Sequence, residues 1–450
     1  MSAPATPWFD NGAALTRAWP PPSGAALAAA MRDVRARDRH GDALHTIAAV
    51  LFVYLSALDQ APNSAGFAIL LTVALTRFAV FPALFTPLLR WPPFWLGLGW
   101  VAWSALSALW SPLGAGALGM LTTQRALLAL VALFPVIDRA RLLAWTLVLA
   151  VGTNSAVQVM QKLGWVEQPG GLTWRPTGIV AIPAVAAINA GIAILLSLAL
   201  LVGARWPARV ALVALTALAA AGLVLSSSRH PALSLAFPML LLPILLAAGG
   251  HVRLRAVVTT AIALVVVAGG ALAVFGGEFT RYMQEAQRDA EAALRGETGF
   301  SSIHARLFWW RLGFEEWLAH PLRGGGLGSF RGFVDAHPAT ADFVAASGIT
   351  REEVLQKHPH SSYVRALAET GVVGFVLFAG AIVACLRCGL ARIGRDPLVA
   401  GATAAVLFVA LATAGECVEL MNVAYAPAVV AIAIAALPRA DGWALPPRRV

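Results

Sequence analysis

Long apolar runs are the feature of this sequence that most restricts what the chain can fold into. Two of them, residues 181–202 and 256–275, reach the length of about 20 residues that a helix needs to cross the hydrocarbon core of a bilayer. The runs are rich in leucine, alanine and valine, and they lack the alternation of polar and apolar residues that marks the strands of a membrane barrel. Because a backbone in lipid has to satisfy its own hydrogen bonds, these runs predict membrane-spanning helices and an all-α fold.

The composition agrees with a lipid environment for most of the chain. Of the 450 residues, 59% are hydrophobic and 12% are charged, compared with about 25% charged residues in ordinary soluble domains. The net charge of +10 could suit nucleic acid, but the arginines are dispersed over short connections, so we expect no nucleic-acid partner. Cys385 and Cys388 form a lone CxxC beside an expected span, and we predict no metal site there.

The charges between the apolar runs predict the topology. Arginines gather in alternate connections, whereas the short loops 59–65, 111–116 and 417–422 contain neither lysine nor arginine. This asymmetry indicates that the arginine-rich connections lie in the cytoplasm. We therefore expect a polytopic helix bundle with about twelve transmembrane helices and both termini in the cytoplasm. The expected spans are 44–58, 66–86, 94–110, 117–136, 142–160, 178–202, 208–226, 232–249, 256–275, 364–386, 397–416 and 423–438.

The same count divides the chain into five regions. Residues 1–43 and 439–450 form the cytoplasmic ends, helices one to nine occupy 44–275, and helices ten to twelve occupy 364–438. The remaining region, 276–363, is a large polar loop that the count places outside the cytoplasm, in the periplasm of a cell with two membranes. We expect this external loop to contain helices and to carry much of the working surface.

Within the loop, residues 301–318 predict an amphipathic helix. Apolar side chains recur there at steps of three and four residues, which places them on one helix face. Such a helix would lie on the membrane or cap the bundle. A glycine cluster at 324–328 then interrupts the regular pattern. The residues of the expected apolar face are Ile303, Leu307, Trp310, Phe314 and Trp317.

Reactive side chains are densest at the end of the loop, where His358, His360 and Tyr363 come immediately before the tenth span. Ser361 and the serine after it are good N-caps for the helix that follows. A helix N-terminus disfavours an imidazolium, so a histidine held there stays neutral and can accept a proton. The alternative is a solvated histidine at a helix start with no chemical role.

Arginines on the same side of the membrane are a second candidate feature. Arg229 falls at the junction of the seventh and eighth spans, Arg175 lies in the connection 161–177, and Arg306 flanks the loop helix. Guanidinium groups bind phosphate oxygens in a bidentate manner, so these side chains predict an anion site. The alternative is that each arginine extends to the membrane interface and binds no substrate.

Two further positions carry charge in unusual places. Arg77 falls near the middle of the second expected span, where a charge costs at least about 2.5 kcal/mol and needs a partner or a water-filled cavity. Glu416 and Glu419 lie at the outer end of the eleventh span, and we expect them to be solvated rather than catalytic. The polar residues that could contact Arg77 within the membrane are Asn154, Gln158 and Asn189.

Five short motifs together resemble the O-antigen ligase and polymerase superfamily of bacterial envelopes. Their order, their spacing and the topology around them match that family, and the resemblance is strongest from about residue 220 to 380. In chain order they are SSSR at 226–229, RxxxW at 306–310, HPLRGGGLGSF at 320–330, HSSY at 360–363 and AETGVVG at 368–374.

The resemblance implies an enzyme of the inner membrane. Members transfer a glycan from undecaprenyl diphosphate to an acceptor sugar at the periplasmic face, and for ligases the acceptor is the lipid A core of lipopolysaccharide. It implies that His360 is the base and that Arg229 and Arg306 hold the diphosphate. The residues themselves make His358, Tyr363 and Arg175 further candidate substrate contacts, and His337 a weaker one. One departure from the family is Ser361, where many members have asparagine.

The expected chemistry needs no metal and no cofactor. A diphosphate is a good leaving group whose charge guanidinium groups can stabilise, and a neutral histidine can deprotonate the acceptor hydroxyl. Direct attack from the opposite face would invert the anomeric centre. We therefore expect a glycosyltransferase whose partners are a lipid-linked glycan, a lipid A core and membrane lipid.

Other functions remain as alternatives. An O-antigen polymerase, which joins one repeat unit to another, shares the same motifs. A protein O-glycosylating transferase is expected less, because those relatives usually carry additional sequence after the last span. A transporter would also explain twelve spans and Arg77, but the sequence shows no repeated half with matched broken helices.

Overall fold

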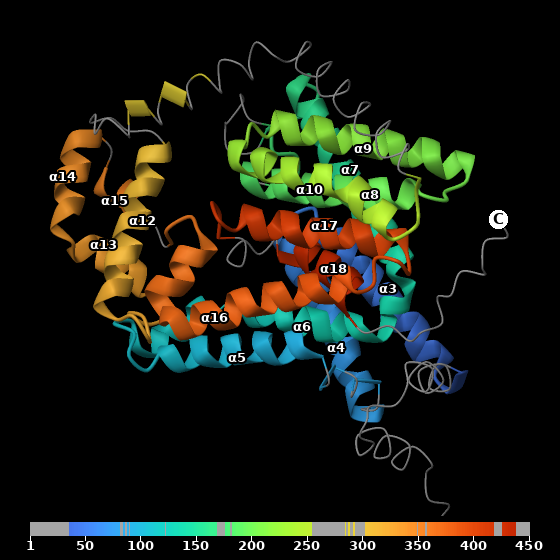
Figure 1. Ribbon diagram of the computed structural model, residues 1–450, viewed down its shortest axis with the longest axis horizontal. Coiled ribbons are helices and arrows are strands. Elements are labelled where there is room, and N and C mark those ends of the chain that lie inside the picture. Colours follow the sequence, from blue (N-terminus) through green and yellow to red (C-terminus); the bar gives the residue numbers. More distant parts are fainter. Residues whose placement is uncertain are drawn as a thin grey trace, which may run out of the picture.

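The computed structural model describes the chain from residue 36 to residue 437 with several gaps, and within the described residues every regular element is a helix (Figure 1). The predicted all-α class is therefore confirmed for this part of the chain. The described residues are 36–81, 84, 85, 88, 89, 91–121, 123–168, 176–180, 182–253, 284, 287, 288, 291, 292, 302–348, 350–355, 358–417 and 425–437.

The helices follow the expected spans in order. Before the loop they are α3 (Arg39–Ser56), α4 (Gln60–Val80), α5 (Pro92–Ser107), η3 (Gly114–Met120), α6 (Thr123–Leu133), η4 (Phe134–Arg139), α7 (Ala140–Lys162), α8 (Pro183–Leu201), α9 (Trp206–Leu225) and α10 (Arg229–Ala248). From the loop onward they are α12 (Ser302–Ala319), α13 (Ser329–Ala336), α14 (Pro338–Ser347), α15 (Arg351–Val354), α16 (Ser362–Leu390), α17 (Pro397–Ala412) and α18 (Tyr425–Ala436).

The chain is a multi-pass membrane protein, because 5 of the described helices, α4, α8, α9, α10 and α16, are long and apolar enough to cross a bilayer. The expected span 256–275 lies outside the described residues, so the count of about twelve stays a prediction. One expected span differs in form: instead of one helix over 117–136, the short α6 lies between the 3-10 segments η3 and η4. The glycines of η3 and Pro135 in η4 explain the interruption, since both residue types weaken a continuous α-helix.

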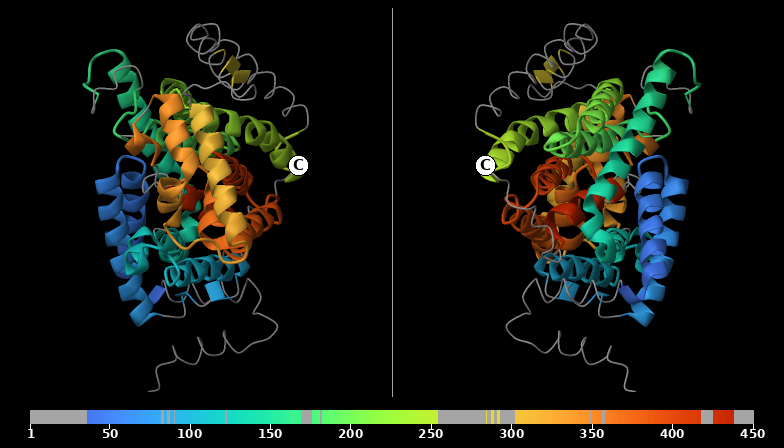
Figure 2. Two further views of the ribbon diagram at one scale, coloured as in Figure 1. Left: turned by 90° about the vertical axis from the view of Figure 1, so that its left-hand side faces the viewer. Right: turned by 90° about the vertical axis from the view of Figure 1, so that its right-hand side faces the viewer.

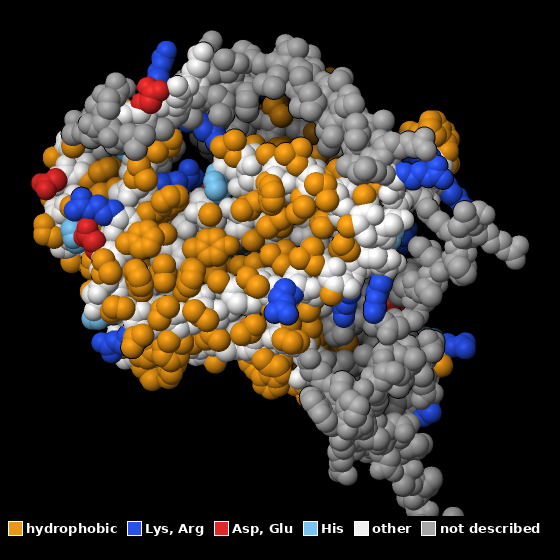
Figure 3. Space-filling view, in the orientation of Figure 1, with side chains coloured by type: hydrophobic (Ala, Val, Ile, Leu, Met, Phe, Trp, Pro, Cys, Tyr) orange, Lys and Arg blue, Asp and Glu red, His pale blue; other side chains and the backbone are white. Residues whose placement is uncertain are grey.

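The bundle is built around α8. It packs against α7, α9, α10 and α17, and almost every side chain along it is buried. A helix that is apolar on all sides belongs in such a position. By contrast, few residues of α9 are buried, so most of its apolar surface faces outward, where lipid would cover it. Figure 3 shows apolar side chains across the middle of one face of the molecule, with charged side chains mostly toward its two ends.

The described part of the loop, helices α12 to α15, lies across one end of the bundle (Figures 1 and 2). The amphipathic helix predicted over 301–318 is present as α12, but its buried stripe differs from the expected one. Ala305, Trp309 and Leu312 are buried, whereas Leu307 and Phe314 are exposed. The difference arises because α12 packs against α16 and α13, so one apolar side caps the bundle and the other remains outside.

The glycine cluster of the loop docks on a break in α16. Gly371 has φ +66° and ψ −170° inside this helix, a conformation that costs an L side chain considerably more than glycine. The break leaves the carbonyl groups of the preceding turn without helical donors. The backbone N–H of Gly325 donates to Ala368 at 2.8 Å, and that of Gly326 donates to Glu369 at 2.9 Å.

The other side of the break is satisfied in the same way. The N–H of Val372 donates to the carbonyl of Pro321 at 2.9 Å, and the indole N–H of Trp103 in α5 donates to the carbonyl of Thr370 at 2.8 Å. Gly324 has φ +71°, and a Cβ there would lie 2.4 Å from the carbonyl carbon of Glu369. The motifs at 320–330 and 368–374 therefore form one junction, which we call the glycine junction.

A buried carboxyl fastens α12 to the same junction. Glu316 is 3% exposed and accepts a hydrogen bond from the hydroxyl of Ser329 at the start of α13. On the neighbouring α16, Glu369 accepts from Nε of Arg365 at 3.0 Å. The two glutamates are near enough for their charges to interact, so ionised Glu316 would repel Glu369.

Arg77 is not at the middle of a span. It lies in the last turn of α4, where Nε donates to Asp38 at 3.0 Å and Nη1 lies 3.1 Å from Nδ1 of His45. The helix ends earlier than the sequence suggested, so the charge reaches acidic partners at the start of α3 instead of polar groups in the bilayer. Asn154, one of the contacts expected for it, instead accepts hydrogen bonds from the N–H groups of residues 179 and 180.

Candidate functional site

Three segments that are far apart in sequence meet beneath the loop helices. Arg306 of α12 donates from Nη2 to Glu416 Oε1 at 2.9 Å. The other carboxylate oxygen of Glu416, which follows α17, lies 3.5 Å from Nδ1 of His360. The structure thus brings together two of the residues expected to carry the chemistry, Arg306 and His360, on opposite oxygens of one carboxylate.

His360 is held in place by its own backbone and by an aromatic ring. Its φ of +51° is in the left-handed region, which is uncommon for a residue other than glycine and is often found at functional sites. The next residue, Ser361, caps α16 by accepting a hydrogen bond from the N–H of Val364. The indole of Trp309 stacks on the imidazole with ring centroids 5.0 Å apart. The imidazole therefore lies at a helix N-terminus, as the sequence predicted.

His358 supports the same turn. Its Nδ1 accepts the backbone N–H of His360 at 3.3 Å, and the two imidazole rings lie 4.7 Å apart, edge to face. This arrangement assigns Nδ1 of His358 to the backbone and leaves its Nε2 as the nitrogen that can carry the proton. His358 therefore shapes the turn that presents His360.

Glu416 was expected to be solvated, but it is 4% exposed. The start of α16 covers the end of α17: the N–H of Ser362 donates to the carbonyl of Thr413 at 2.9 Å, and its hydroxyl donates to the carbonyl of Glu416 at 3.1 Å. The expectation was wrong because the burial comes from two helices that are remote in sequence. The only local signal was an acidic residue directly after an apolar span.

Arg229 opens α10 at the same end of the bundle, with Nε and Nη1 shielded from solvent. The next residue, His230, is one that the sequence analysis missed. Its Nε2 lies 3.1 Å from the carbonyl of Ala412, so this nitrogen carries a proton. The carboxylate of Glu416 and the guanidinium of Arg306 are both near enough to His230 for their charges to interact with it.

The remaining candidates are placed differently. Arg175 lies outside the described residues. His337 begins α14, where Nδ1 accepts the N–H of Ala339 and Nε2 lies 3.0 Å from Glu315, so both ring nitrogens are occupied on the loop helices. Tyr363 donates its hydroxyl to the carbonyl of Ala410 in α17 at 2.8 Å, which ties α16 to α17 beside the site.

Comparison with known families identifies the central part of the chain. Residues 214–379 match the family model described as O-antigen ligase. This segment is an O-antigen ligase domain. The resemblance seen in the sequence motifs is thereby confirmed for residues 214–379, and a match to this family is consistent with an enzyme. No curated protein matches the chain.

The O-antigen ligase domain contributes only part of the candidate site. It includes Arg229, Arg306 and His360, but Glu416 comes after its last matched residue. The structure closes the site by bringing the end of α17 under α12 and the start of α16. Among the described residues, no group of three or more His, Cys, Asp or Glu side chains is arranged to hold a metal ion.

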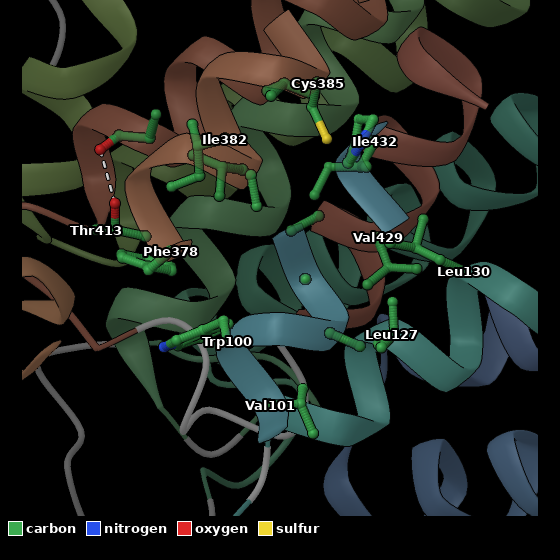
Figure 4. Close-up of a pocket in the computed structure, with 18 of the residues that line it drawn as sticks. Trp100, Val101, Leu127, Leu130, Phe378, Ile382, Cys385, Thr413, Val429 and Ile432 are labelled. Atoms are coloured by element: carbon green, nitrogen blue, oxygen red, sulfur yellow. Dashed lines mark hydrogen bonds between the residues drawn. The ribbon is translucent and has the colours of Figure 1, made fainter. Parts of the chain in front are cut away.

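An apolar cavity of about 160 Å³ lies between α5, α6, α16, α17 and α18, and Phe378 is the lining residue that belongs to the matched segment 214–379. Figure 4 shows Trp100 of α5, Leu127 of α6, Phe378 of α16 and Val429 of α18 around it. Thr413, which accepts from the start of α16 and shortly precedes Glu416 in the chain, also lines the cavity. The cavity therefore reaches from the membrane-spanning helices toward the candidate site.

Proposed function

We propose that this protein is an O-antigen ligase that transfers a glycan from undecaprenyl diphosphate to a sugar of the lipid A core. The observation that carries the proposal is the meeting of His360 and Arg306 on one buried carboxylate, within an O-antigen ligase domain. One group can take a proton and the other can hold an anion. A glycosyl transfer from a diphosphate needs both functions at one place.

The transfer is a single displacement at the anomeric carbon of the donor. His360 takes the proton of the acceptor hydroxyl as the oxygen attacks. The new glycosidic bond forms as the bond between the anomeric carbon and the diphosphate breaks, and the diphosphate leaves with the bonding electrons. Arg306 and Arg229 stabilise the charge that develops on it. Attack from the opposite face inverts the anomeric centre, and neither a cofactor nor a metal takes part.

The topology supports a periplasmic site in the inner membrane of a bacterium. The loops 59–65, 111–116 and 417–422 lack lysine and arginine, and the last of these begins beside Glu416, so the site lies at the end of the bundle that the positive-inside rule places outside. In this arrangement 276–363 is the periplasmic loop, and the segments before 44 and after 438 lie in the cytoplasm.

The apolar cavity provides a place for the single hydrocarbon chain of the donor. Its lining is apolar and includes residues of the candidate span α16, and Thr413, three residues before Glu416 in the chain, also lines it. A chain buried there would place the diphosphate near Arg306. We assign Arg175, His358 and Tyr363 to contacts with donor or acceptor, and His337 would join them only by exchanging its contact with Glu315.

Transfer assays with purified protein, lipid-linked glycan and a core acceptor test this proposal. We expect His360→Ala to reduce transfer by at least about 10²-fold, the usual contribution of a general base, while the protein stays in the membrane. Arg306→Ala and Arg229→Ala should impair transfer more than replacement by lysine, because lysine keeps the charge. Activity should survive a chelator. Full activity of His360→Ala, or strict dependence on a metal, would refute the mechanism.

A deletion strain separates a ligase from a polymerase. Loss of a ligase leaves lipid A core without O-chain while lipid-linked polymer accumulates. Loss of a polymerase instead leaves core substituted with single repeat units. The first pattern, restored by the wild-type gene and not by the His360→Ala variant, is the expected result.

A further inference from the structure

Glu416 contacts both Arg306 and His360, the anion-binding group and the base of the proposed reaction. One oxygen accepts from Arg306 at 2.9 Å and the other lies 3.5 Å from Nδ1 of His360. The carboxylate is 6% exposed. A buried carboxylate is costly unless it is paired, so these two contacts account for its presence at the end of an apolar helix.

The backbone fixes the carboxylate relative to the imidazole. The hydroxyl of Ser362, two residues after His360, donates to the carbonyl of Glu416 at 3.1 Å. The N–H of Ser362 donates to Thr413 at 2.9 Å. The turn that carries the histidine and the turn that carries the glutamate are therefore joined directly, and the side-chain contact does not depend on the loop helices.

The contact determines which nitrogen of His360 is available. An ionised carboxylate can only accept hydrogen bonds, so Nδ1 has to carry the proton when it faces Glu416. Nε2 then presents its lone pair, which is the form that a general base needs. When Nε2 takes up a proton from the acceptor, the negative charge beside Nδ1 stabilises the imidazolium.

Other groups face the same pair and affect its charge. Arg306 in α12 and His230 in α10 face the carboxylate. His358 lies against the edge of the His360 ring, and the uncharged indole of Trp309 covers its face. Arg306 is positively charged and lies on the same carboxylate, so the negative charge of Glu416 offsets the charge of Arg306 beside His360.

We propose that Glu416 is a positioning residue for glycan transfer, which fixes the tautomer of His360 and holds Arg306 beside it. The inference rests on the proposed function of His360 as the base. It adds a residue from outside the matched O-antigen ligase segment, so the region after α17 completes the catalytic arrangement.

The test compares Glu416→Gln and Glu416→Asp with wild type in the transfer assay, using the full chain in lipid, across a range of pH. The glutamine variant keeps the shape but can donate to Nδ1, which favours the wrong tautomer. We expect its maximal rate to fall by about 10²-fold, and the acid limb of its rate profile to move to lower pH. The aspartate variant keeps the charge, so it should recover part of the rate, and the acid limb of its rate profile should lie at the wild-type pH.

Glu352→Gln is the matched control, because Glu352 is 76% exposed and contacts Arg331 on the loop surface; wild-type rate and pH profile are expected. A purely structural role for Glu416 would lower the amount of active protein without moving the limb, and that result overturns the proposal. A wild-type pH profile for Glu416→Gln, together with an inactive His360→Ala variant, would also overturn the proposal for Glu416, while His360 would remain the proposed base. Full activity of His360→Ala would instead refute the proposed function itself.

Discussion

Replacing Glu316 by glutamine should make the stability of the protein less sensitive to a rise in pH through the neutral range. Burial raises the pKa of the Glu316 carboxyl to about 8; the hydrogen bond from Ser329 opposes this rise, and the charge of Glu369 adds to it. One pKa unit corresponds to about 1.4 kcal/mol, so the rise from 4.5 to about 8 amounts to at most about 5 kcal/mol. The folded-state pKa is raised, so this contribution to stability is fully present below pH 4.5 and is lost as the pH rises through about 8.

Thermal denaturation of the purified protein in lipid at pH values from 5 to 9 measures this effect. Wild type should lose stability across the range, with roughly 3 kcal/mol of the loss complete by pH 7. Glu316→Gln carries no charge at any pH and keeps an oxygen that can accept from Ser329, so its curve should be flatter. Glu352→Gln, on the exposed loop surface, should follow wild type. Parallel curves for wild type and Glu316→Gln would show that the pKa of Glu316 is not raised in the folded protein, and would refute this reasoning.

Two further predictions concern the glycine junction and the cavity. Gly324→Ala should destabilise the protein by roughly 2–5 kcal/mol, because it places an alanine in a left-handed conformation and adds a Cβ that overlaps α16. In the control Gly332→Ala of α13, the added Cβ meets no atom within 4 Å, so this variant should be neutral or more stable by up to about 1 kcal/mol. Equal denaturation midpoints for the two variants would contradict the role of the glycine junction. Ala381→Phe narrows the apolar cavity, so kcat/KM for a long-chain donor should fall by about tenfold, which corresponds to the burial energy of roughly two methylene groups. The kcat/KM for a short-chain analogue should not change. An equal loss for both donors would exclude a hydrocarbon chain in the cavity.

The helices were predictable wherever composition alone decides structure. A helix such as α8 is apolar on every side, and its bounds in the structure, Pro183–Leu201, fall within the expected span 178–202. The segment 117–136 was not predictable in the same way, because hydropathy does not register the interruption between α6 and η4. Arg77 shows the same weakness, since a shift of the helix end by several residues moved it from the bilayer to an ion pair with Asp38.

The site was partly predictable from residue type and topology. Arg306 and His360 were identified because arginine is unusual on the outer side and because a histidine precedes a helix start. Glu416 and His230 could not be recognised, since each lies at the end of an otherwise ordinary apolar helix. Glu416 contacts Arg306 of α12, which is 110 residues away in the sequence. His230 contacts Ala412 of α17, which is 182 residues away.

The glycine junction gives the family motifs at 320–330 and 368–374 a physical role that their sequence did not show. The junction fixes the loop helices to α16 through main-chain hydrogen bonds. Because Arg306 lies on α12 and His360 lies just before the N-cap of α16, the junction sets the distance between the proposed anion-binding group and the proposed base. A displacement of about 1 Å between such groups can reduce a rate by about 10²-fold. Substitutions such as Gly324→Ala should therefore lower transfer activity even in the fraction of protein that remains folded, although no glycine of the junction contacts His360.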